Sequence, residues 1–244
     1  MSWIALLLLG IAVADLGHSI RPVPYVPECV GAGAAVLVGI LCDLTALRDV
    51  LALVVIAGVV VGWGIAVRQG FGRTRASWPL VWIGAAFVVA VAVAPAAGSA
   101  GGVLDDWLAR DPLPVVDGLS ADRLLLVVAL FLVQMSTGNV IVRLVLTATG
   151  TVNPARTGSI DDPATQLKGG RLLGPMERLF ILGLGLAGQL TAASIVIAAK
   201  GLLRFPELRS KPEQDRIHRL TEYFLVGSFV SWLIPLASLV LLAT

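Results

Sequence analysis

Three polar residues, Arg178, Gln189 and Lys200, recur at intervals of eleven in the otherwise apolar stretch 175–203. Eleven residues make three helical turns plus about 20°, so on one continuous helix about 40 Å long these side chains share a face. Hydrocarbon does not tolerate such a face, and we expect it to meet other helices or a wet cavity. This stretch is therefore where binding or chemistry is expected.

A second group of charges lies at the end of this stretch and at the start of the last apolar one. Lys200 and Arg204 are one turn apart, and Glu222 and Tyr223 lie near the start of the final span. If the two helices are antiparallel neighbours, Glu222 lies within reach of both cations and orients Arg204. The excess positive charge favours an anionic ligand, such as a lipid headgroup or a phosphate. The competing interpretation is that both cations snorkel to the membrane surface without forming a site.

Two further charged residues, Arg171 and Glu177, support this predicted anion site from the sequence just before the helix and its first turn. Pro175 suits a first helical position, and an acid two residues later complements the helix dipole, which gives Glu177 a structural explanation as well. An alternative function is an enzyme acting on a phosphorylated lipid, with Glu177 or Glu222 as acid or base and the cations holding phosphate oxygens. The sequence offers that enzyme no evident nucleophile.

A third alternative is a small carrier. Asp15 and His18 form an i, i+3 pair that a proton-coupled carrier could use as a relay, although a solvated helix end explains the pair more simply. No internal repeat, which many carriers possess, is visible in the sequence.

The composition is that of an integral membrane protein. Hydrophobic residues make up 57% and charged residues 14% of the chain, and the mean hydropathy is +0.90. Soluble domains have roughly 45–50% apolar and about 25% charged residues. The net charge is +2 and no basic tract is present, which argues against nucleic acid as a partner. With two His, two Cys and no CxxC or HExxH spacing, no metal site or cofactor is expected, and Cys29 and Cys42 are interpreted as packing thiols.

The fold predicted from these features is all-α, a polytopic transmembrane helical bundle with six to seven spans. The chain is divided into N-terminal transmembrane helices (1–148), a polar loop (149–174) and a C-terminal helix pair (175–244). The apolar run from Trp3 to Ala14 has no preceding positive charge and is taken as a retained first helix. The expected spans are 2–19, 28–47, 50–68, 78–98, 121–148, 175–203 and 220–243.

Local signals add detail to these spans. Ser77 and Ser120 are expected to cap helices, and a kink or break is expected at Gly138. Small residues at four-residue spacings favour close helix packing in the two C-terminal spans. They are Gly183, Ala187, Gly188 and Ala192 in one span, and Tyr223, Gly227, Ser231 and Pro235, with Ser238 three further on, in the other.

The C-terminal third resembles an uncharacterised bacterial integral-membrane family, a domain of unknown function. The matching pieces, in order, are Gly169 to Arg178, Gln189, Ala198-Ala199-Lys200 through Arg204-Phe205, and Glu222 to Ser228. The resemblance implies a multi-pass protein of the bacterial plasma membrane and supplies no substrate. We therefore expect a non-enzymatic membrane module that binds an anionic lipid headgroup or a partner, either another membrane protein or a second copy of itself.

Overall fold

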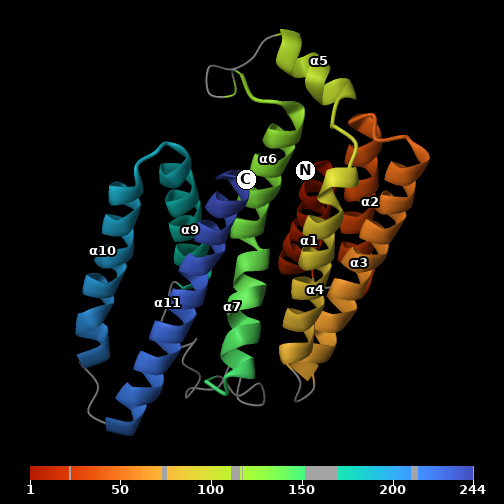
Figure 1. The fold of residues 1–244 in the computed structure, drawn as a ribbon. Coiled ribbons are helices and arrows are strands. Elements are labelled where there is room, and N and C mark those ends of the chain that lie inside the picture. The colour runs from red at the N-terminus through yellow and green to blue at the C-terminus, as the bar shows by residue number, and fades with distance from the viewer. Residues whose placement is uncertain are drawn as a thin grey trace. The chain divides into compact units, whose positions relative to one another are not determined.

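The computed structural model describes residues 1–21, 23–72, 76–110, 116, 118–151, 170–209 and 214–243. Within these ranges only the backbone is described for residues 72, 170–172, 200, 201, 203–209 and 214–220. All regular secondary structure in the described part is helical, as Figure 1 shows, which confirms the all-α prediction.

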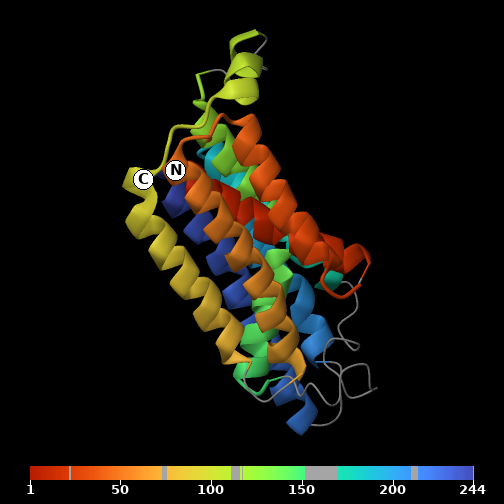
Figure 2. The same ribbon diagram turned by 90° about the vertical axis from the view of Figure 1, so that its right-hand side faces the viewer.

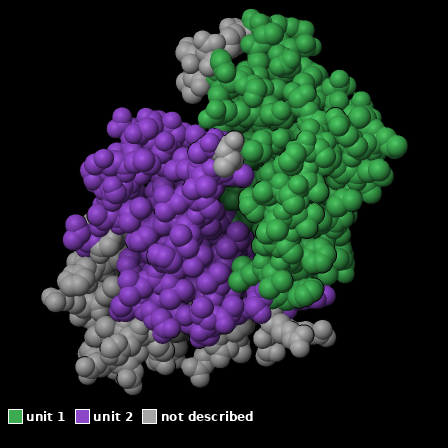
Figure 3. Space-filling view, viewed as in Figure 1, with its two compact units in different colours: residues 1–68, 78–137 green, residues 69–77, 138–244 purple. Residues whose placement is uncertain are grey.

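The chain divides into two compact units, which Figure 3 distinguishes by colour. Unit 1 comprises Met1–Arg68 and Trp78–Thr137, and unit 2 comprises Gln69–Ser77 and Gly138–Thr244. The boundary at 137/138 differs from the expected one at 148/149. The helix that follows it belongs with the C-terminal helices because its side chains pack against them, as described below.

Unit 1 is built around α1 (Ser2–Ile20), which contacts α2 and α6 most extensively. Residues 3–14 of α1 are apolar on every side, which is typical of a helix that its neighbours enclose. A side chain at Gly31 would collide with the backbone oxygen of Gly10, so α1 and α2 cross in direct backbone contact. The remaining elements are α2 (Val26–Leu41), α3 (Leu47–Gly72, up to Arg68), α4 (Ser77–Val93), the 3-10 helix η1 (Ala94–Ala96), α5 (Gly102–Arg110) and α6 (Ala121–Met135).

Helices α3 and α4 run side by side in opposite directions, as Figures 1 and 2 show. A side chain at Gly62 would lie 2.6 Å from the ring of Trp82, so the indole of α4 rests on the backbone of α3 at this point. Its Nε1 lies 3.5 Å from the Val59 oxygen, to which it donates. Trp78 stands one turn earlier, with its ring centroid 6.4 Å from that of Trp82. The N-terminal end of α4 is thus fixed by tryptophans.

Unit 2 contains the last four described helices. Helix α9 contacts both α10 and α11. The stripe of small residues on α11 is its packed face, as predicted: Ser231, Pro235 and Ser238 are buried. Gly227 faces Leu146 of α7. The elements are α7 (Thr137–Ala148), α9 (Gly170–Leu186), α10 (Leu190–Arg209) and α11 (Gln214–Ala243).

The prediction of one continuous helix over 175–203 is wrong. Helix α9 ends at Leu186, and α10 begins at Leu190 and folds back against α9. Gly188 adopts a left-handed conformation with φ +72, and the Gln189 N–H bonds to the Leu184 oxygen, 2.8 Å away. This six-to-one bond with a left-handed glycine is the Schellman ending of a helix. Gly188 therefore stops the helix and does not pack in its middle.

The helix-start interpretation of Pro175 is also wrong. Helix α9 begins at Gly170, so Pro175 lies inside its second turn and Glu177 lies deeper still. Two other local predictions are close to the structure. Ser120 caps α6 by accepting from the Arg123 N–H at 3.3 Å. The break expected at Gly138 occurs two residues earlier, at Ser136, between α6 and α7.

Among the described residues, four helices are long and apolar enough to cross a bilayer, or five if α6 and α7 count as one broken span. The predicted number of six to seven is not confirmed. The difference arises at two places: α2 is only 16 residues long, and the sixth expected span is two helices. The four are Ser2–Ile20, Leu47–Phe71, Ser77–Ala96 and Thr221–Ala243.

Candidate functional site

Arg178 lies at the centre of a polar cluster inside unit 2. Its side chain is among the largest that are fully buried, with 1% of the residue exposed. One guanidinium nitrogen donates to Asn139 Oδ1 of α7 at 2.8 Å, and another donates to Ser231 Oγ of α11 at 3.1 Å. A side chain at Gly138 would lie 2.6 Å from Arg178 Nε, so the guanidinium rests directly on the α7 backbone. Arg178 therefore ties three helices together, shielded by protein as the sequence predicted.

Glu177 makes a parallel connection between α9 and α11. Its carboxylate is buried and accepts from Trp232 Nε1 at 2.7 Å, a short charge-assisted hydrogen bond. Consecutive residues of α9, Glu177 and Arg178, thus bond to consecutive residues of α11, Trp232 and Ser231. The two bonds fix both the register and the rotation of α9 against α11.

The other residues of the predicted anion site do not share a helix face with Arg178. Gln189 is exposed in the turn between α9 and α10, at the end of α9 and not along it. The eleven-residue spacing places side chains on one face only along an unbroken helix. The turn at Gly188 divides this helix into α9 and α10. Glu222 is exposed and Tyr223 is half-buried near the start of α11.

The remaining cations of the predicted site, Arg171, Lys200 and Arg204, have side chains outside the described residues. Their backbone positions show how far Lys200 and Glu222 each lie from the connection between α10 and α11. Lys200 lies nine residues before the end of α10, and Glu222 lies eight residues after the start of α11. At about 1.5 Å per residue, both are roughly 12–14 Å from the connection between these helices. The proposed pairing of Glu222 with these cations stays a prediction.

Unit 1 contains a second charged cluster that sequence reasoning did not assemble. Asp15 of α1 and Glu28 of α2 are 9% and 4% exposed. Trp63 Nε1 of α3 lies 3.1 and 3.3 Å from the two Asp15 carboxylate oxygens, to which it donates. Arg68, also on α3, places a guanidinium nitrogen 3.3 Å from Glu28 Oε1. The interpretation of Asp15 as a solvated helix end is therefore wrong, while His18 is exposed.

The surroundings of Glu28 show how the fold accommodates a buried acid. A side chain at Gly64 would collide with the Glu28 Cγ, so the acid lies against bare α3 backbone. Arg68, which pairs with Glu28, also lies over the ring of Tyr25, with its Cζ 4.2 Å from the ring centroid. The guanidinium is thus held between a carboxylate and an aromatic face.

A third buried carboxylate, Asp49, has a structural role at the other end of unit 1. Its Oδ1 accepts from Trp3 Nε1 at 2.9 Å and from the Gly98 N–H at 3.1 Å. Ser2 Oγ donates to the Gly98 oxygen at 2.6 Å. Arg48 lies 3.8 Å from Asp49 Oδ2 and is otherwise exposed. Asp49 therefore joins the start of α1 to the chain after η1, and it also pairs with Arg48.

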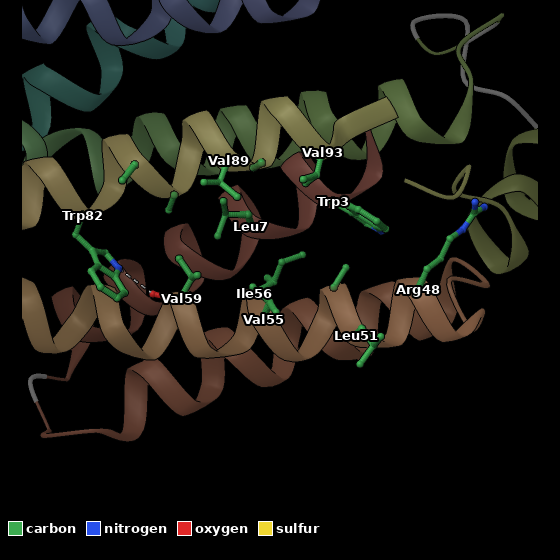
Figure 4. Close-up of a pocket in the computed structure, with 14 residues that line it drawn as sticks. Trp3, Leu7, Arg48, Leu51, Val55, Ile56, Val59, Trp82, Val89 and Val93 are labelled. Atoms are coloured by element: carbon green, nitrogen blue, oxygen red, sulfur yellow. Dashed lines mark hydrogen bonds between the residues drawn. The ribbon is translucent and has the colours of Figure 1, made fainter. Parts of the chain in front are cut away.

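A long apolar cleft of about 480 Å³ runs between α3 and α4, with α1 as its floor (Figure 4). Arg48 lies at one end of the cleft and Trp82 at the other. Small residues of α4 keep the cleft open, and none of the described side chains that line it is acidic. The apolar side chains that line it are Trp3, Leu7, Leu51, Ala52, Val55, Ile56, Val59, Ala85, Ala86, Val89, Ala90 and Val93.

No known family, curated protein or solved structure matches this chain. The resemblance to an uncharacterised bacterial membrane family stays a prediction. The cluster of unit 2 is closed by protein groups, whereas the cleft of unit 1 is open along its length and has a cation at one end.

Proposed function

We propose that this chain is a multi-pass, non-enzymatic protein of a bacterial plasma membrane that binds one acyl chain of an anionic lipid in the cleft between α3 and α4. The observation that carries the proposal is the wholly apolar lining of a cleft that ends at an exposed arginine. An amphipathic molecule with a hydrocarbon tail and a negative headgroup complements both features.

The outer surfaces of α3 and α4 support a membrane environment. Only 6% of the most apolar window in Ser77–Ala96 is buried inside the protein, and 28% of that in Leu47–Phe71. Val81, Val88 and Val89 of α4 are each about 60% exposed. Soluble monomers rarely expose an apolar surface that covers a whole helix, because it would drive association in water. In a bilayer the same surface meets lipid without penalty.

The length of the cleft fits one leaflet. Arg48 and Val59 are eleven residues apart on α3, a rise of about 16 Å. Half of a hydrocarbon core about 30 Å thick is about 15 Å. An acyl chain whose headgroup lies at Arg48 would therefore reach the level of Val59, the midpoint of the Leu47–Phe71 span. The volume also lies within the usual range of ligand pockets, about 300–1,000 Å³.

Arg48 is suited to a headgroup because its guanidinium is only partly engaged. Its closest described polar contact is the Asp49 carboxylate, 3.8 Å from Nε, and that carboxylate already accepts two other hydrogen bonds. More than half of the Arg48 side chain is exposed. A phosphate at the membrane surface can therefore take two parallel N–H donors from it.

The test is the lipid retained by purified protein. Ala86→Phe fills the cleft and should remove the co-purifying phospholipid detected by native mass spectrometry, whereas Ala92→Phe adds the same ring to an exposed position of α4 outside the cleft and should not. Arg48→Gln should lower the affinity for anionic lipid about fivefold, which is the effect of one charge at the membrane surface. Arg110→Gln, an exposed arginine of α5, is its control.

Equal lipid retention in Ala86→Phe and Ala92→Phe would reject the cleft as the site. If anionic lipid were instead lost from Lys200→Gln or Arg204→Gln, the headgroup site predicted from the sequence would be the correct one. Lipid turnover by the wild-type protein, abolished in Glu177→Gln or Glu222→Gln, would establish the enzymatic alternative.

A further inference from the structure

Among the described residues, the charged cluster of unit 1 has one more acidic than basic side chain. Asp15 and Glu28 are both buried acids, and the charge of Glu28 acts on that of Asp15. Arg68 is the cation that faces them in the described part of the chain, and its side chain is about 29% exposed. With both acids ionised, the cluster carries one uncompensated negative charge in an apolar bundle, where isolated charge is strongly unfavourable.

Two oxygen atoms in this cluster have no hydrogen-bond donor among the described residues. Glu28 Oε1 faces Arg68, but Glu28 Oε2 is buried and makes no hydrogen bond. Thr137, at the break between α6 and α7, is 1% exposed and its hydroxyl lies at the Asp15 carboxylate. The Thr137 hydroxyl also makes no hydrogen bond of good geometry. Arg68 Nη2, 3.3 Å from Glu28 Oε1, likewise makes no hydrogen bond of good geometry within the described residues. One described cation still faces two acids, and buried polar atoms are nearly always paired, so the open oxygens indicate a second positive partner.

We propose that unit 1 binds a monovalent metal cation, with Na⁺ as the probe, through oxygens of Asp15, Glu28 and Thr137. The ligands on offer are carboxylate and hydroxyl oxygens, which suit hard cations and not zinc or copper. One positive charge balances the cluster, and a divalent ion would leave the opposite excess. Trp63 Nε1 is shared between the two Asp15 oxygens, which have about four lone-pair sites in all, so Asp15 retains capacity for a metal.

The position of the cluster gives the cation a route to water. Asp15 lies five residues before the end of α1, Glu28 is in the first turn of α2, and Arg68 is near the end of α3. All three thus lie close to helix ends, within about 8 Å along their own helix axes. The neighbouring α1–α2 connection carries Tyr25, which is exposed. Both acids of the site therefore lie near the α1–α2 connection, which is the side from which a cation would reach them.

The experiment compares thermal unfolding of detergent-purified full-length protein in NaCl and in choline chloride at equal ionic strength and pH. A ligand that binds only the native state raises Tm, and sodium about fivefold above Kd should raise it by about 2–4 °C for a chain of this size. Asp15→Asn and Thr137→Val should abolish the sodium-dependent rise. Asp105→Asn, which changes an exposed acid of α5, should keep it.

Thr137→Val keeps the shape of the side chain and all charges, so it guards against variants that simply fail to fold. Equal Tm values of the wild type in the two salts would overturn the inference. A sodium effect that persists in both Asp15→Asn and Thr137→Val would do the same. This inference is independent of the lipid cleft, because Ala86→Phe should leave the sodium-dependent rise intact.

Discussion

The two charged clusters solve the same problem in different ways. In unit 2, Arg178 donates to Asn139 and Ser231, and Glu177 accepts from Trp232, so each buried charge meets polar groups from other helices. In unit 1, Glu28 Oε2, the Thr137 hydroxyl and Arg68 Nη2 make no hydrogen bond of good geometry within the described chain. A cluster whose polar groups are bonded across helices stabilises packing, whereas one with open oxygens can bind something from outside.

The comparison also shows why burial of a charge is poor evidence of a binding site. Arg178 is buried more completely than any acid of unit 1, and its described donors point at protein oxygens. Such a guanidinium cannot bind a headgroup without giving up those bonds. What marks a site is the set of polar atoms that the fold leaves open after its own hydrogen bonds are formed.

The largest effect is expected from Arg178→Met. The substitution keeps an unbranched chain but leaves Asn139 Oδ1 and Ser231 Oγ without their charged donor, so the free energy of unfolding should fall by about 3–5 kcal/mol. Denaturant unfolding followed by circular dichroism measures it. Arg143→Met, at an exposed arginine of α7 over the Phe71 ring, should change stability far less. Similar losses in the two variants would contradict the role of Arg178 as a structural tie.

Smaller changes in the free energy of unfolding, of opposite sign, are expected at two glycines of α3. In Gly64→Ala the new methyl group collides with Glu28 Cγ and should destabilise unit 1 by about 1–3 kcal/mol. In Gly58→Ala the methyl group meets nothing within 4 Å, and the better helix propensity should stabilise by about 0.5–1 kcal/mol. The two unfolding midpoints, measured side by side, give the result. If Gly64→Ala were as stable as Gly58→Ala, Glu28 would not be packed on the α3 backbone.

The composition and hydropathy were sufficient to predict an all-helical, apolar architecture, because 57% hydrophobic residues with few charges leave few other folds. The packed stripe of α11 was also predictable, since small residues at four-residue spacings are a local property of one helix. The cap at Ser120 is local in the same sense.

The end of α9 could not be predicted from spacing, because Gly188 serves equally well as a packing residue or as a helix stop. Its left-handed conformation depends on α10 finding a surface on α9, a contact between segments that periodicity does not report. The site in unit 1 was missed for a similar reason. Asp15, Glu28, Arg68 and Thr137 come from four separate segments, and each alone resembles an ordinary residue near a helix end.

The smallest effect is a difference in salt response between two tryptophans that play the same part in the two clusters. Trp63→Phe and Trp232→Phe each remove an N–H donor from a buried carboxylate, and each should lose about 1.5–3 kcal/mol. When Trp63→Phe removes its donor, a bound cation in unit 1 partly compensates the charge of the Asp15 carboxylate. The loss of unfolding free energy in Trp63→Phe should therefore be smaller in NaCl than in choline chloride. The loss in Trp232→Phe should be the same in both salts, because Arg178 is the neighbour of Glu177. Equal salt dependence of the two variants would remove the distinction between an open and a closed cluster.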